Sequence, residues 1–410
     1  MTSIEGAGSS SPWMTIWLSP RQTIERIVAQ WPHYSVLPLA VLGGIAAAAD
    51  ALINSGLGSV LQDWRVWLAC VPIGAIIGIA NLYINAVFAA WLARRMGGQA
   101  STDAVRAVFA WGVLPIILGQ LVVLAVIVGS LASGVSVASP LLTPWLSIVN
   151  GIFGLWSVVI TLLMLSRVER FGFWRTMVSY WCSALLLAVL LAIFVRTILF
   201  QPFNMPSSSM APTLLNGDYF FVSKYAYGYS HYSLPFSPPL FSGRIFTSEP
   251  ARGDVVVFRL PKDDATDYVK RVVGLPGDRV QMKQGLLYIN DTPVTRERLP
   301  DFVGADPCGA ASVAKVKHWR ETLPNGVSHE TLDCVDNGFY DNTNVYTVPE
   351  GHFFVLGDNR DNSTDSRVLS AVGYIPFEYL IGRVGLIFFS RTSLSGVAAN
   401  RPERFGLIVR

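Results

Sequence analysis

Hydrophobic positions in the first half of the chain form long, uninterrupted stretches. Each is long enough to cross about 30 Å of hydrocarbon as a helix. The segment from Val71 to Ala93 is apolar on nearly every side, whereas a helix at the surface of a soluble protein keeps one polar face. The pattern predicts an all-α bundle of about five transmembrane spans. They lie at residues 35–55, 66–93, 106–131, 144–165 and 177–200.

After residue 200 the pattern changes to short runs rich in β-branched and aromatic residues. Gly, Pro, Asp or Asn bounds each run, as is typical of strands. We find no helical period of useful length in this half, so the pattern predicts a mainly-β antiparallel domain. Its expected strands lie within residues 218–228, 253–260, 267–275, 278–291, 351–358 and 380–389.

Charge follows the same division of the chain. Sixteen of the first 200 residues are charged, against 43 of the last 210. A typical soluble domain carries roughly 25% charged residues, so we expect the first half in lipid and the second in water. This composition excludes a purely cytosolic enzyme, a disordered chain and a small disulfide-dense secreted domain. The net charge of +3 includes no dense basic cluster, which argues against a nucleic-acid partner.

Arginines between the spans predict the orientation of the membrane domain. Eight of these arginines either precede the first span or lie in the second-to-third and fourth-to-fifth links. The other two links carry only Arg65. Because positive residues collect on the cytoplasmic side, the N-terminus is predicted in the cytoplasm and the β domain across the membrane. Residues 1–12 lack a basic start and an apolar core, so the first span is expected to be an uncleaved anchor.

Two polar residues, Asp50 and Asn150, lie within or at the edge of apolar stretches. An intramembrane acid can mark a proton or ion path, but contact with a neighbouring helix or a span end is the favoured interpretation. The segments WLSPRQTIERIVAQWP (17–32) and GGQASTDAVRAVFAWGVLP (97–115) resemble the Yip-type family of multi-spanning membrane domains. That resemblance implies no known chemistry.

The water-exposed half contains several candidate nucleophiles. None of the five histidines lies near a Gly-x-Ser-x-Gly turn, so a Ser-His-Asp triad lacks its usual signal. Cys70 and Cys182 fall in or beside spans, whereas Cys308 and Cys334 lie in the half expected in an oxidising compartment. For the latter pair a disulfide is favoured over a metal site or a thiol nucleophile. A serine activated by a lysine remains as the main candidate.

Four sequence blocks provide such a serine and lysine. They are MPSSSMAPTL (205–214), RGDVVVF (252–258), YVKRVVGLPGD (268–278) and GDNRDNSTDSR (357–367). Together they resemble bacterial type I signal peptidases, the serine–lysine leader peptidases, over about residues 190–390. The resemblance implies a β-rich catalytic domain of that type with a small accessory subdomain, and neither a cofactor nor a metal.

By this resemblance Ser209 matches the family nucleophile and Lys270 its general base. Ser207 matches the side chain that assists the oxyanion hole, together with the backbone N–H of Ser209. Ser363 matches the hydroxyl that orients the lysine.

Charged residues match the supports of the site. Asp365 and Arg367 match the ion pair that braces the site. Arg271 follows the base as in the family, and Asp358 belongs to the same group of supporting residues. The chain departs from the family pattern at Ser208, where glycine is common. A small side chain is expected to fit there.

A lysine can act as a base only if its amine is kept neutral. The ordinary pKa of lysine is about 10.4, and burial among apolar residues can lower it by several units. In a strand, alternation places Lys270 with Tyr268 on one face and Arg271 on the other. The lysine is therefore predicted to point inward and the arginine outward. Spacing alone would also fit an ordinary exposed strand lysine.

About nine residues link the last span to Ser209, which keeps the nucleophile within about 30 Å of the lipid surface. A substrate held at the membrane, such as a translocated preprotein with its signal sequence, suits this position. The resemblance implies cleavage after small residues in an Ala-x-Ala pattern. The substrate strand is expected between residues 203–207 and the strand that carries Lys270. Its expected contacts are Phe203, Met205, Asp267 and Tyr268.

The predicted function is a membrane-bound serine endopeptidase that removes N-terminal signal peptides from translocated preproteins. It is expected in the bacterial cytoplasmic membrane, with its catalytic domain on the extracytoplasmic side. Expected partners are secreted preproteins and the lipid bilayer, with the protein-translocation machinery as a candidate and no nucleic acid. The alternative is a membrane scaffold or trafficking protein with a vestigial peptidase domain. The expected domains are a Yip-type membrane domain (1–175), a last anchor (176–200), the peptidase domain (201–280 and 351–395), an accessory subdomain (281–350) and a C-terminal tail (396–410).

Overall fold

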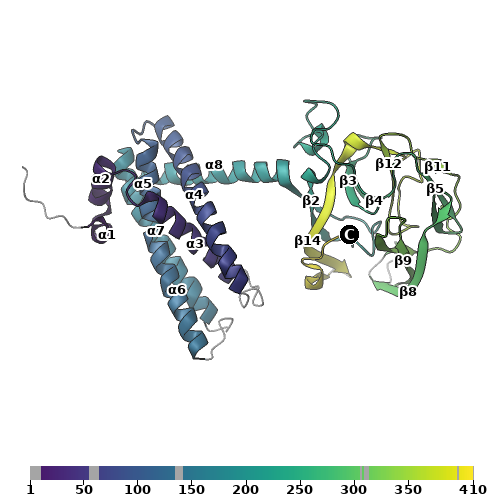
Figure 1. Cartoon of the computed structure of the whole chain (residues 1–410), viewed down its shortest axis with the longest axis horizontal. Coiled ribbons are helices and arrows are strands. Elements are labelled where there is room, and N and C mark those ends of the chain that lie inside the picture. Colours follow the sequence, from purple (N-terminus) through teal and green to yellow (C-terminus); the bar gives the residue numbers. More distant parts are fainter. Residues whose placement is uncertain are drawn as a thin grey trace, which may run out of the picture. The chain divides into compact units, whose positions relative to one another are not determined.

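The computed structural model divides into two compact units, Met1–Leu190 and Leu191–Arg410. The first unit is helical and the second is built of strands, as the elements labelled in Figure 1 show. The residues that the structure describes are 11–54, 64–133, 142–304, 307–308, 314–394 and 397–409.

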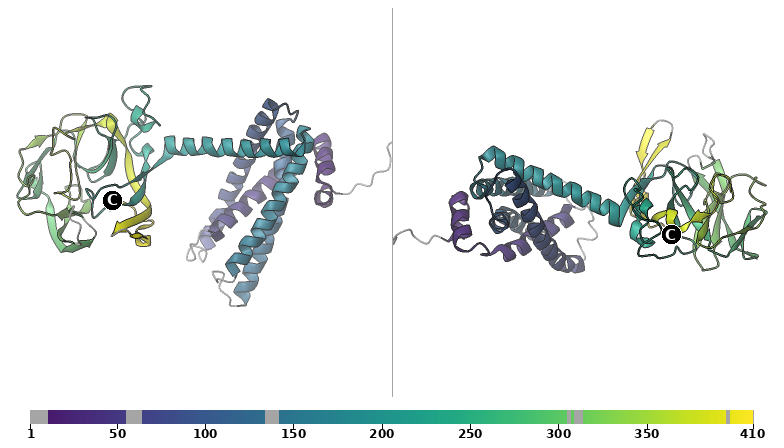
Figure 2. Two further views of the ribbon diagram at one scale, coloured as in Figure 1. Left: turned by 180° about the vertical axis from the view of Figure 1, so that it is seen from behind. Right: turned by 90° about the horizontal axis from the view of Figure 1, so that it is seen from above.

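Helices account for nearly all of the described part of the first unit. Five apolar stretches are long enough to span a membrane, which confirms the five predicted spans. They are Val36–Ile53, Arg65–Arg95, Thr102–Ser130, Pro144–Glu169 and Phe173–Leu199. The helices are α1 (Pro12–Thr15), α2 (Pro20–Gln30), α3 (Val36–Asn54), α4 (Trp64–Arg95), α5 (Thr102–Gly112), α6 (Leu114–Ala132), α7 (Leu142–Glu169) and α8 (Phe173–Phe194). Helices α6 and α7 lie side by side in the views of Figures 1 and 2.

The third span consists of two helices rather than one. Helix α5 begins after Ser101, whose side chain accepts a hydrogen bond from the Ala104 backbone N–H. It ends at Gly112, and α6 begins at Leu114. Pro115, in the first turn of α6, has no backbone N–H to continue the hydrogen bonds of α5. The apolar pattern continues through this break, so it predicts the span but not its division.

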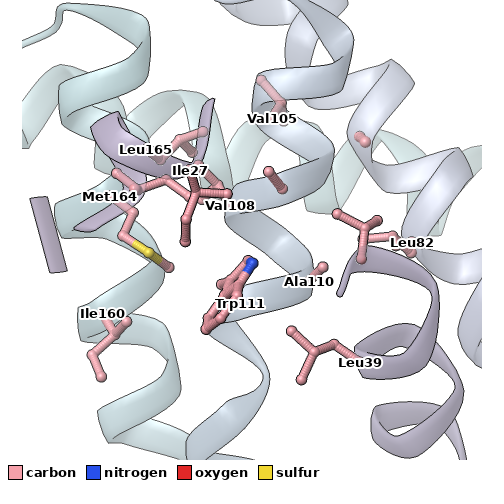
Figure 3. Close-up of a cluster of buried hydrophobic side chains, with 14 of the residues drawn as sticks. Ile27, Leu39, Leu82, Val105, Val108, Ala110, Trp111, Ile160, Met164 and Leu165 are labelled. Carbon is pink, nitrogen blue, oxygen red and sulfur yellow. The ribbon is translucent and has the colours of Figure 1, made fainter. Parts of the chain in front are cut away.

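A hydrophobic cluster around Trp111 joins the helices of the first unit (Figure 3). The Trp111 ring is fully buried, and its Nε1 donates a hydrogen bond to the Tyr34 carbonyl at 3.2 Å. The short helix α2 contributes Ile27 to the same cluster. The other labelled members come from α3, α4, α5 and α7: Leu39, Leu82, Val105, Val108, Ala110, Ile160, Met164 and Leu165.

Asp50 and Asn150 face each other inside the helical unit. The Asn150 side-chain amide donates a hydrogen bond to Asp50 Oδ1 at 2.5 Å. Gln120 donates to the same oxygen at 3.2 Å and to Asn150 Oδ1 at 3.1 Å. These three residues belong to α3, α6 and α7. Asp50 therefore contacts neighbouring helices, as the favoured interpretation predicts.

The second unit contains antiparallel sheets, which confirms the predicted fold class. Its largest sheet has eight strands in the order β1-β2-β14-β3-β4-β12-β13, with β15 paired to β14. The strands are β1 (Phe200–Asn204), β2 (Asp218–Ser223), β3 (Val255–Arg259), β4 (Asp267–Gly274), β12 (His352–Leu356), β13 (Ile375–Pro376), β14 (Leu380–Leu394) and β15 (Val397–Asn400).

Two smaller sheets follow β4 in the chain. One has four strands: β5 (Arg279–Lys283), β6 (Leu286–Ile289), β7 (Thr292–Pro293) and β11 (Tyr346–Thr347). The other has three strands, β8 (Thr295–Gly304), β9 (Ala314–Thr322) and β10 (Ser328–Asp333), in the order β10-β9-β8. Short helical turns complete the unit: Val195–Leu199, Lys224–Ala226, His231–Ser233, Phe377–Tyr379 and Pro402–Arg404.

The end of the chain packs against the largest sheet. Strand β15 pairs with β14, and Ile408 forms an isolated bridge to Leu386. Arg404 Nη2 lies 2.6 Å from the buried Asp218 carboxylate at the start of β2. The segment expected as a C-terminal tail therefore helps to fix the strand that follows the nucleophile segment.

Candidate active site

Ser209 lies in the segment that connects β1 to β2. Backbone hydrogen bonds from Met205 N to Asp218 O (2.8 Å) and from Gly217 N to Met205 O (2.9 Å) hold the two ends of this segment together. Between them the chain turns, with Leu214 N bonded to Met210 O at 2.9 Å. Both of those side chains are completely buried. The apolar anchors hold Ser209 at the edge of the core, where its residue is 8% exposed.

Lys270 reaches Ser209 from the middle of β4. Its Nζ lies 2.8 Å from the Ser209 Oγ, within hydrogen-bond distance. Lys270 is paired with Val256 on β3 and is 4% exposed. The structure therefore brings together the two residues predicted to form a dyad.

The surroundings of Lys270 disfavour its charged form. Burial lowers the pKa of Lys270 to about 8, although the carboxylates of Asp365 and Asp358 act in the opposite direction. The Arg367 guanidinium adds a smaller lowering effect. A substantial fraction of the amine is therefore neutral in mildly alkaline solution and can accept a proton.

Ser207 lies beside Ser209, as expected for a residue that assists the oxyanion hole. Its hydroxyl donates a hydrogen bond to the Ser209 Oγ at 3.3 Å. The Ser207 residue is exposed, so its hydroxyl can rotate toward a substrate oxygen near the nucleophile.

The prediction that Arg271 points outward is wrong. Arg271 is fully buried and forms a two-pronged ion pair with Asp358, with Nε–Oδ1 at 2.8 Å and Nη2–Oδ2 at 2.7 Å. Its Nη1 also donates to the Gly253 carbonyl at 2.7 Å. Alternation does send Arg271 to the face opposite Lys270, but both faces of β4 are covered. Burial alone would raise the pKa of Asp358, and the Arg271 guanidinium instead holds it below its ordinary value.

Asp365 and Arg367 form the second ion pair of the site, as expected. Arg367 Nε lies 2.8 Å from Asp365 Oδ1, and the Gly357 backbone N–H donates to Asp365 Oδ2 at 3.0 Å. Arg367 also donates to the Arg360 carbonyl. Burial would raise the pKa of Asp365, but the Arg367 guanidinium holds it below its usual range. The carboxylate is therefore ionised near Lys270.

The expected contact between Ser363 and Lys270 is not present. The Ser363 Oγ is buried and has no hydrogen-bond partner among the described residues. It is lodged against Gly357, where an added Cβ would lie only 2.2 Å from the Ser363 Oγ. Gly357 is thus required for the close approach of this loop, while the lysine amine bonds to Ser209 instead.

A cleft of about 500 Å³ opens beside the two residues. Strand β1 is the edge strand of its sheet. Residues 267–270 of β4 pair with β3 on one side, and β12 pairs with β4 only from Arg271 onward. Two strand edges without a partner in the described chain therefore border the cleft. The lining includes the four expected substrate contacts: Phe203, Met205, Asp267 and Tyr268.

Comparisons with known proteins identify the family of the chain. A family model described as signal peptidase, peptidase S26, matches residues 178–389. The chain belongs to the peptidase S26 family. A Yip1 domain model also matches residues 14–196, which confirms the resemblance of the helical unit.

Two relatives from Rickettsia support the same assignment. Signal peptidase I of Rickettsia typhi is 44% identical over 210 residues, which are 49% of this chain and 76% of the relative. That of Rickettsia akari is 42% identical over 220 residues, 52% of this chain and 79% of the relative. A crystal structure of a signal peptidase I from Enterococcus faecalis V583 is 27% identical to this chain. The match covers 33% of this chain and 97% of the crystallised chain, with a TM-score of 0.20.

This S26 peptidase is therefore an enzyme, and its five apolar helices make it a membrane protein. The alternative of a scaffold with a vestigial peptidase domain is not favoured by these matches.

The structure joins Cys308 and Cys334 in a disulfide with their Cα atoms 5.9 Å apart. Cys334 follows β10 directly, and its backbone N–H donates to Asp361 Oδ2 at 2.8 Å. The disulfide therefore lies next to residues 357–363 of this S26 peptidase, called the GDNRDNS loop below. The sequence did not indicate this position.

Three residues around the site were missed by the sequence reasoning. Thr213 donates a hydrogen bond to Asp358 Oδ2 at 2.5 Å. Asn359 donates to the Ser209 carbonyl through its backbone N–H at 3.1 Å. Glu321 contacts Arg360 from β9. Asn359 and Thr213 lie inside the quoted sequence blocks and could have been included, whereas no local signal marks Glu321.

Proposed function

We propose that this S26 peptidase is a serine endopeptidase that removes N-terminal signal peptides from preproteins, with Ser209 as the nucleophile and Lys270 as the general base. The observation that carries the proposal is the 2.8 Å contact between Lys270 Nζ and Ser209 Oγ. Burial of the lysine, with its pKa lowered to about 8, adds the second requirement of a base.

Acylation follows from this contact. Neutral Lys270 accepts the hydroxyl proton as Ser209 Oγ attacks the scissile carbonyl carbon. The resulting oxyanion would be stabilised by the backbone N–H of Ser209 and the hydroxyl of Ser207. Collapse of this intermediate breaks the C–N bond, and the lysine ammonium gives its proton to the departing amine. The mature protein leaves with a new N-terminus.

Deacylation repeats the same steps with water. Lys270, again neutral, accepts a proton from a water molecule that attacks the ester carbonyl. Breaking the ester bond returns the proton to Ser209 Oγ and releases the signal peptide with a free carboxylate. The two buried carboxylates near Lys270, those of Asp365 and Asp358, stabilise the transient ammonium.

The preprotein would bind as an additional strand between residues 203–207 and the first half of β4. The unpaired edges along the cleft support this mode, because an extended chain can form backbone hydrogen bonds with both. Phe203, Met205, Asp267 and Tyr268 would contact its side chains. Cleavage after small residues in an Ala-x-Ala pattern is the specificity we propose.

The membrane placement belongs to the same proposal. We place the N-terminus in the cytoplasm and the catalytic domain on the extracytoplasmic side of the bacterial cytoplasmic membrane, because eight arginines lie on one set of links and one on the other. The domains predicted from the sequence, from the Yip-type membrane domain to the C-terminal tail, are part of this proposal. Preproteins held by their signal peptides and the bilayer would be its partners, with the translocation machinery as a candidate.

The test is cleavage of a purified preprotein by the full chain in phospholipid vesicles, with the cut site mapped by mass spectrometry. Ser209→Ala and Lys270→Ala should each abolish cleavage. The matched control is Lys262→Ala, which removes an exposed lysine whose amine donates to the Ser370 carbonyl. Cleavage by either dyad variant at the wild-type rate would refute the assignment, as would a wild-type chain that cuts nowhere near the signal-peptide boundary.

A further inference from the structure

The three-stranded sheet β8–β9–β10 is attached to the GDNRDNS loop by backbone hydrogen bonds. Leu332 N donates to Asp358 O, and Arg360 N donates to Leu332 O, both at 2.9 Å. Leu332 therefore bridges to Asn359 in a parallel arrangement, and all of these residues are buried or nearly so. This part of the loop behaves as a short extra strand beside β10.

A buried ion pair attaches the same loop to β9. The Glu321 side chain is fully buried and contacts both terminal nitrogens of Arg360, with Nη1–Oε1 at 3.0 Å. Arg296 Nε, on β8, lies 3.6 Å from the Glu321 Oε1. Burial would raise the pKa of Glu321, but the Arg360 guanidinium holds it below its usual value. A buried charge that loses its partner strongly destabilises the folded chain. The ion pair with Glu321 therefore fixes the position of the Arg360 side chain.

Asn359, next to Arg360 in the chain, holds the nucleophile segment. Its backbone N–H donates to Ser209 O at 3.1 Å, and its side-chain amide donates to Ser208 O at 3.2 Å. Asn359 is itself fully buried. A continuous series of contacts thus runs from Glu321 through Arg360 and Asn359 to the backbone of Ser209.

The disulfide provides a second attachment to this loop. The Pro307 carbonyl accepts hydrogen bonds from the side chains of Asn359 and Asn362, the latter at 3.0 Å. Pro307 precedes Cys308, which is bonded to Cys334 after β10. The loop is therefore held by β9 through an ion pair and by the disulfide segment through two asparagines.

We propose that this three-stranded sheet positions the nucleophile, with Glu321 as the positioning residue that acts through Arg360 and Asn359; this inference rests on the proposed function of Ser209. A rate that depends on a 2.8 Å contact is sensitive to small displacements of the serine backbone. A misplacement of about 1 Å from a distant substitution can cost about a hundredfold in rate. The sheet thus acts on catalysis without contacting the substrate.

The chain offers a matched control on the same sheet. Glu330 of β10 also contacts nitrogen-bearing side chains, His318 at 3.0 Å and Arg320 at 3.9 Å, but its side chain is 43% exposed. Among the described residues, the hydrogen bond and ion pairs of the Glu330 side chain do not reach the GDNRDNS loop. Glu321→Gln and Glu330→Gln therefore make the same chemical change, one on the proposed series of contacts and one off it.

The experiment measures kcat and KM for preprotein cleavage by the full-length variants at a temperature where each is folded, as judged by circular dichroism. Glu321→Gln should lower kcat about ten- to a hundredfold with KM changed less than about twofold, because strand binding in the cleft is retained. Glu330→Gln should keep both constants. If wild type and Glu330→Gln do not cleave, the proposed function fails; if they cleave and Glu321→Gln matches them, only the positioning role fails.

A double-substitution cycle separates positioning from general loss of stability. Asn359→Ala should lower kcat, and the pair Glu321→Gln/Asn359→Ala should lower it less than the product of the single effects, because both act on one series of contacts. Multiplicative effects in folded protein would overturn the proposal. If Glu321→Gln does not fold, Glu321→Asp is used in its place, since it keeps the charge and shortens the reach to Arg360. A folded Glu321→Asp with wild-type kcat would equally overturn it.

Discussion

The side-chain amine of Lys270 lies 2.8 Å from the hydroxyl oxygen of Ser209, although 61 residues separate them in the chain. Strand β4 carries the lysine and is paired with β3, and buried apolar side chains anchor the turn that holds the serine. The contact serves proton transfer only when the amine is neutral. The acid–base properties of Lys270 therefore set the first prediction.

Cleavage should increase with pH in the range around 8. The protonated amine cannot accept the Ser209 proton, and burial lowers the pKa of Lys270 to about 8. The value of kcat/KM should therefore be small well below pH 8 and reach a plateau above it. A pH–rate profile for a preprotein substrate checks this, with circular dichroism at each pH as the control for folding. A profile that falls as pH rises from 6 to 9 would contradict the role given to Lys270.

Replacement of Asp365 should move this profile toward lower pH. The Asp365 carboxylate raises the pKa of Lys270 by stabilising its ammonium, so Asp365→Asn removes that effect and should lower the midpoint. The maximal rate should also fall, because Arg367 loses its buried partner. Asp291→Asn, a change in an exposed carboxylate paired with Arg279, is the control and should leave the midpoint in place. A midpoint that shifts upward in Asp365→Asn would show that the sign of this interaction is wrong.

Ser207→Ala should slow cleavage about 100- to 1,000-fold, the usual effect of removing one oxyanion-hole donor. The hydroxyl lies 3.3 Å from Ser209 Oγ, close to where the substrate oxygen would sit. The loss should fall on kcat rather than KM, because the oxyanion exists only in the transition state and the intermediate. Ser370→Ala, at an exposed serine, serves as the comparison. An equal rate for these two variants would remove Ser207 from the mechanism.

Much of the site could be predicted from the sequence because its residues lie in compact blocks. Ser209, Lys270 and the Asp365–Arg367 pair were assigned from such blocks, and the structure brings them together. The five spans followed from the apolar stretches themselves, because about twenty consecutive apolar residues have few alternatives to crossing a membrane.

The sequence was less informative wherever a residue depends on a distant partner. Alternation along β4 gave the correct face for Arg271 but the wrong exposure, because a loop carrying Asp358 covers that face. Glu321 pairs with Arg360 across 39 residues, and nothing near it in the chain marks it as buried. Ser363 was assigned a contact with the lysine, but close packing against Gly357 holds its hydroxyl elsewhere.

Removal of Arg271 alone should destabilise the β unit strongly. Arg271→Met removes one partner and leaves a buried carboxylate without its cation, at a cost of about 3–5 kcal/mol in the free energy of unfolding. The control is Arg279→Met, which breaks an exposed pair with Asp291 and should cost less than about 1 kcal/mol. Denaturant unfolding of the full chain in detergent micelles, followed through the β-unit transition, compares the two. Equal midpoints for both variants would contradict the assignment of a buried, fully paired arginine.

The polar cluster of the helical unit should stabilise helix packing only modestly. Asp50→Leu removes the hydrogen bonds from Gln120 and Asn150, but these two side chains keep the bond between them at 3.1 Å. Hydrogen bonds between membrane helices average about 0.6 kcal/mol and reach about 1.7 kcal/mol, so we expect a loss of about 1 kcal/mol in unfolding free energy. Asn85→Leu is the control, because the hydrogen bonds found for Asn85 go to Asn81 in the same helix.

The same variant tests whether Asp50 belongs to an ion path. If the cluster serves only helix packing, Asp50→Leu should cleave preproteins at the wild-type rate in vesicles, with or without a proton gradient. A rate that depends on the gradient in wild type and not in Asp50→Leu would instead assign Asp50 to an ion path.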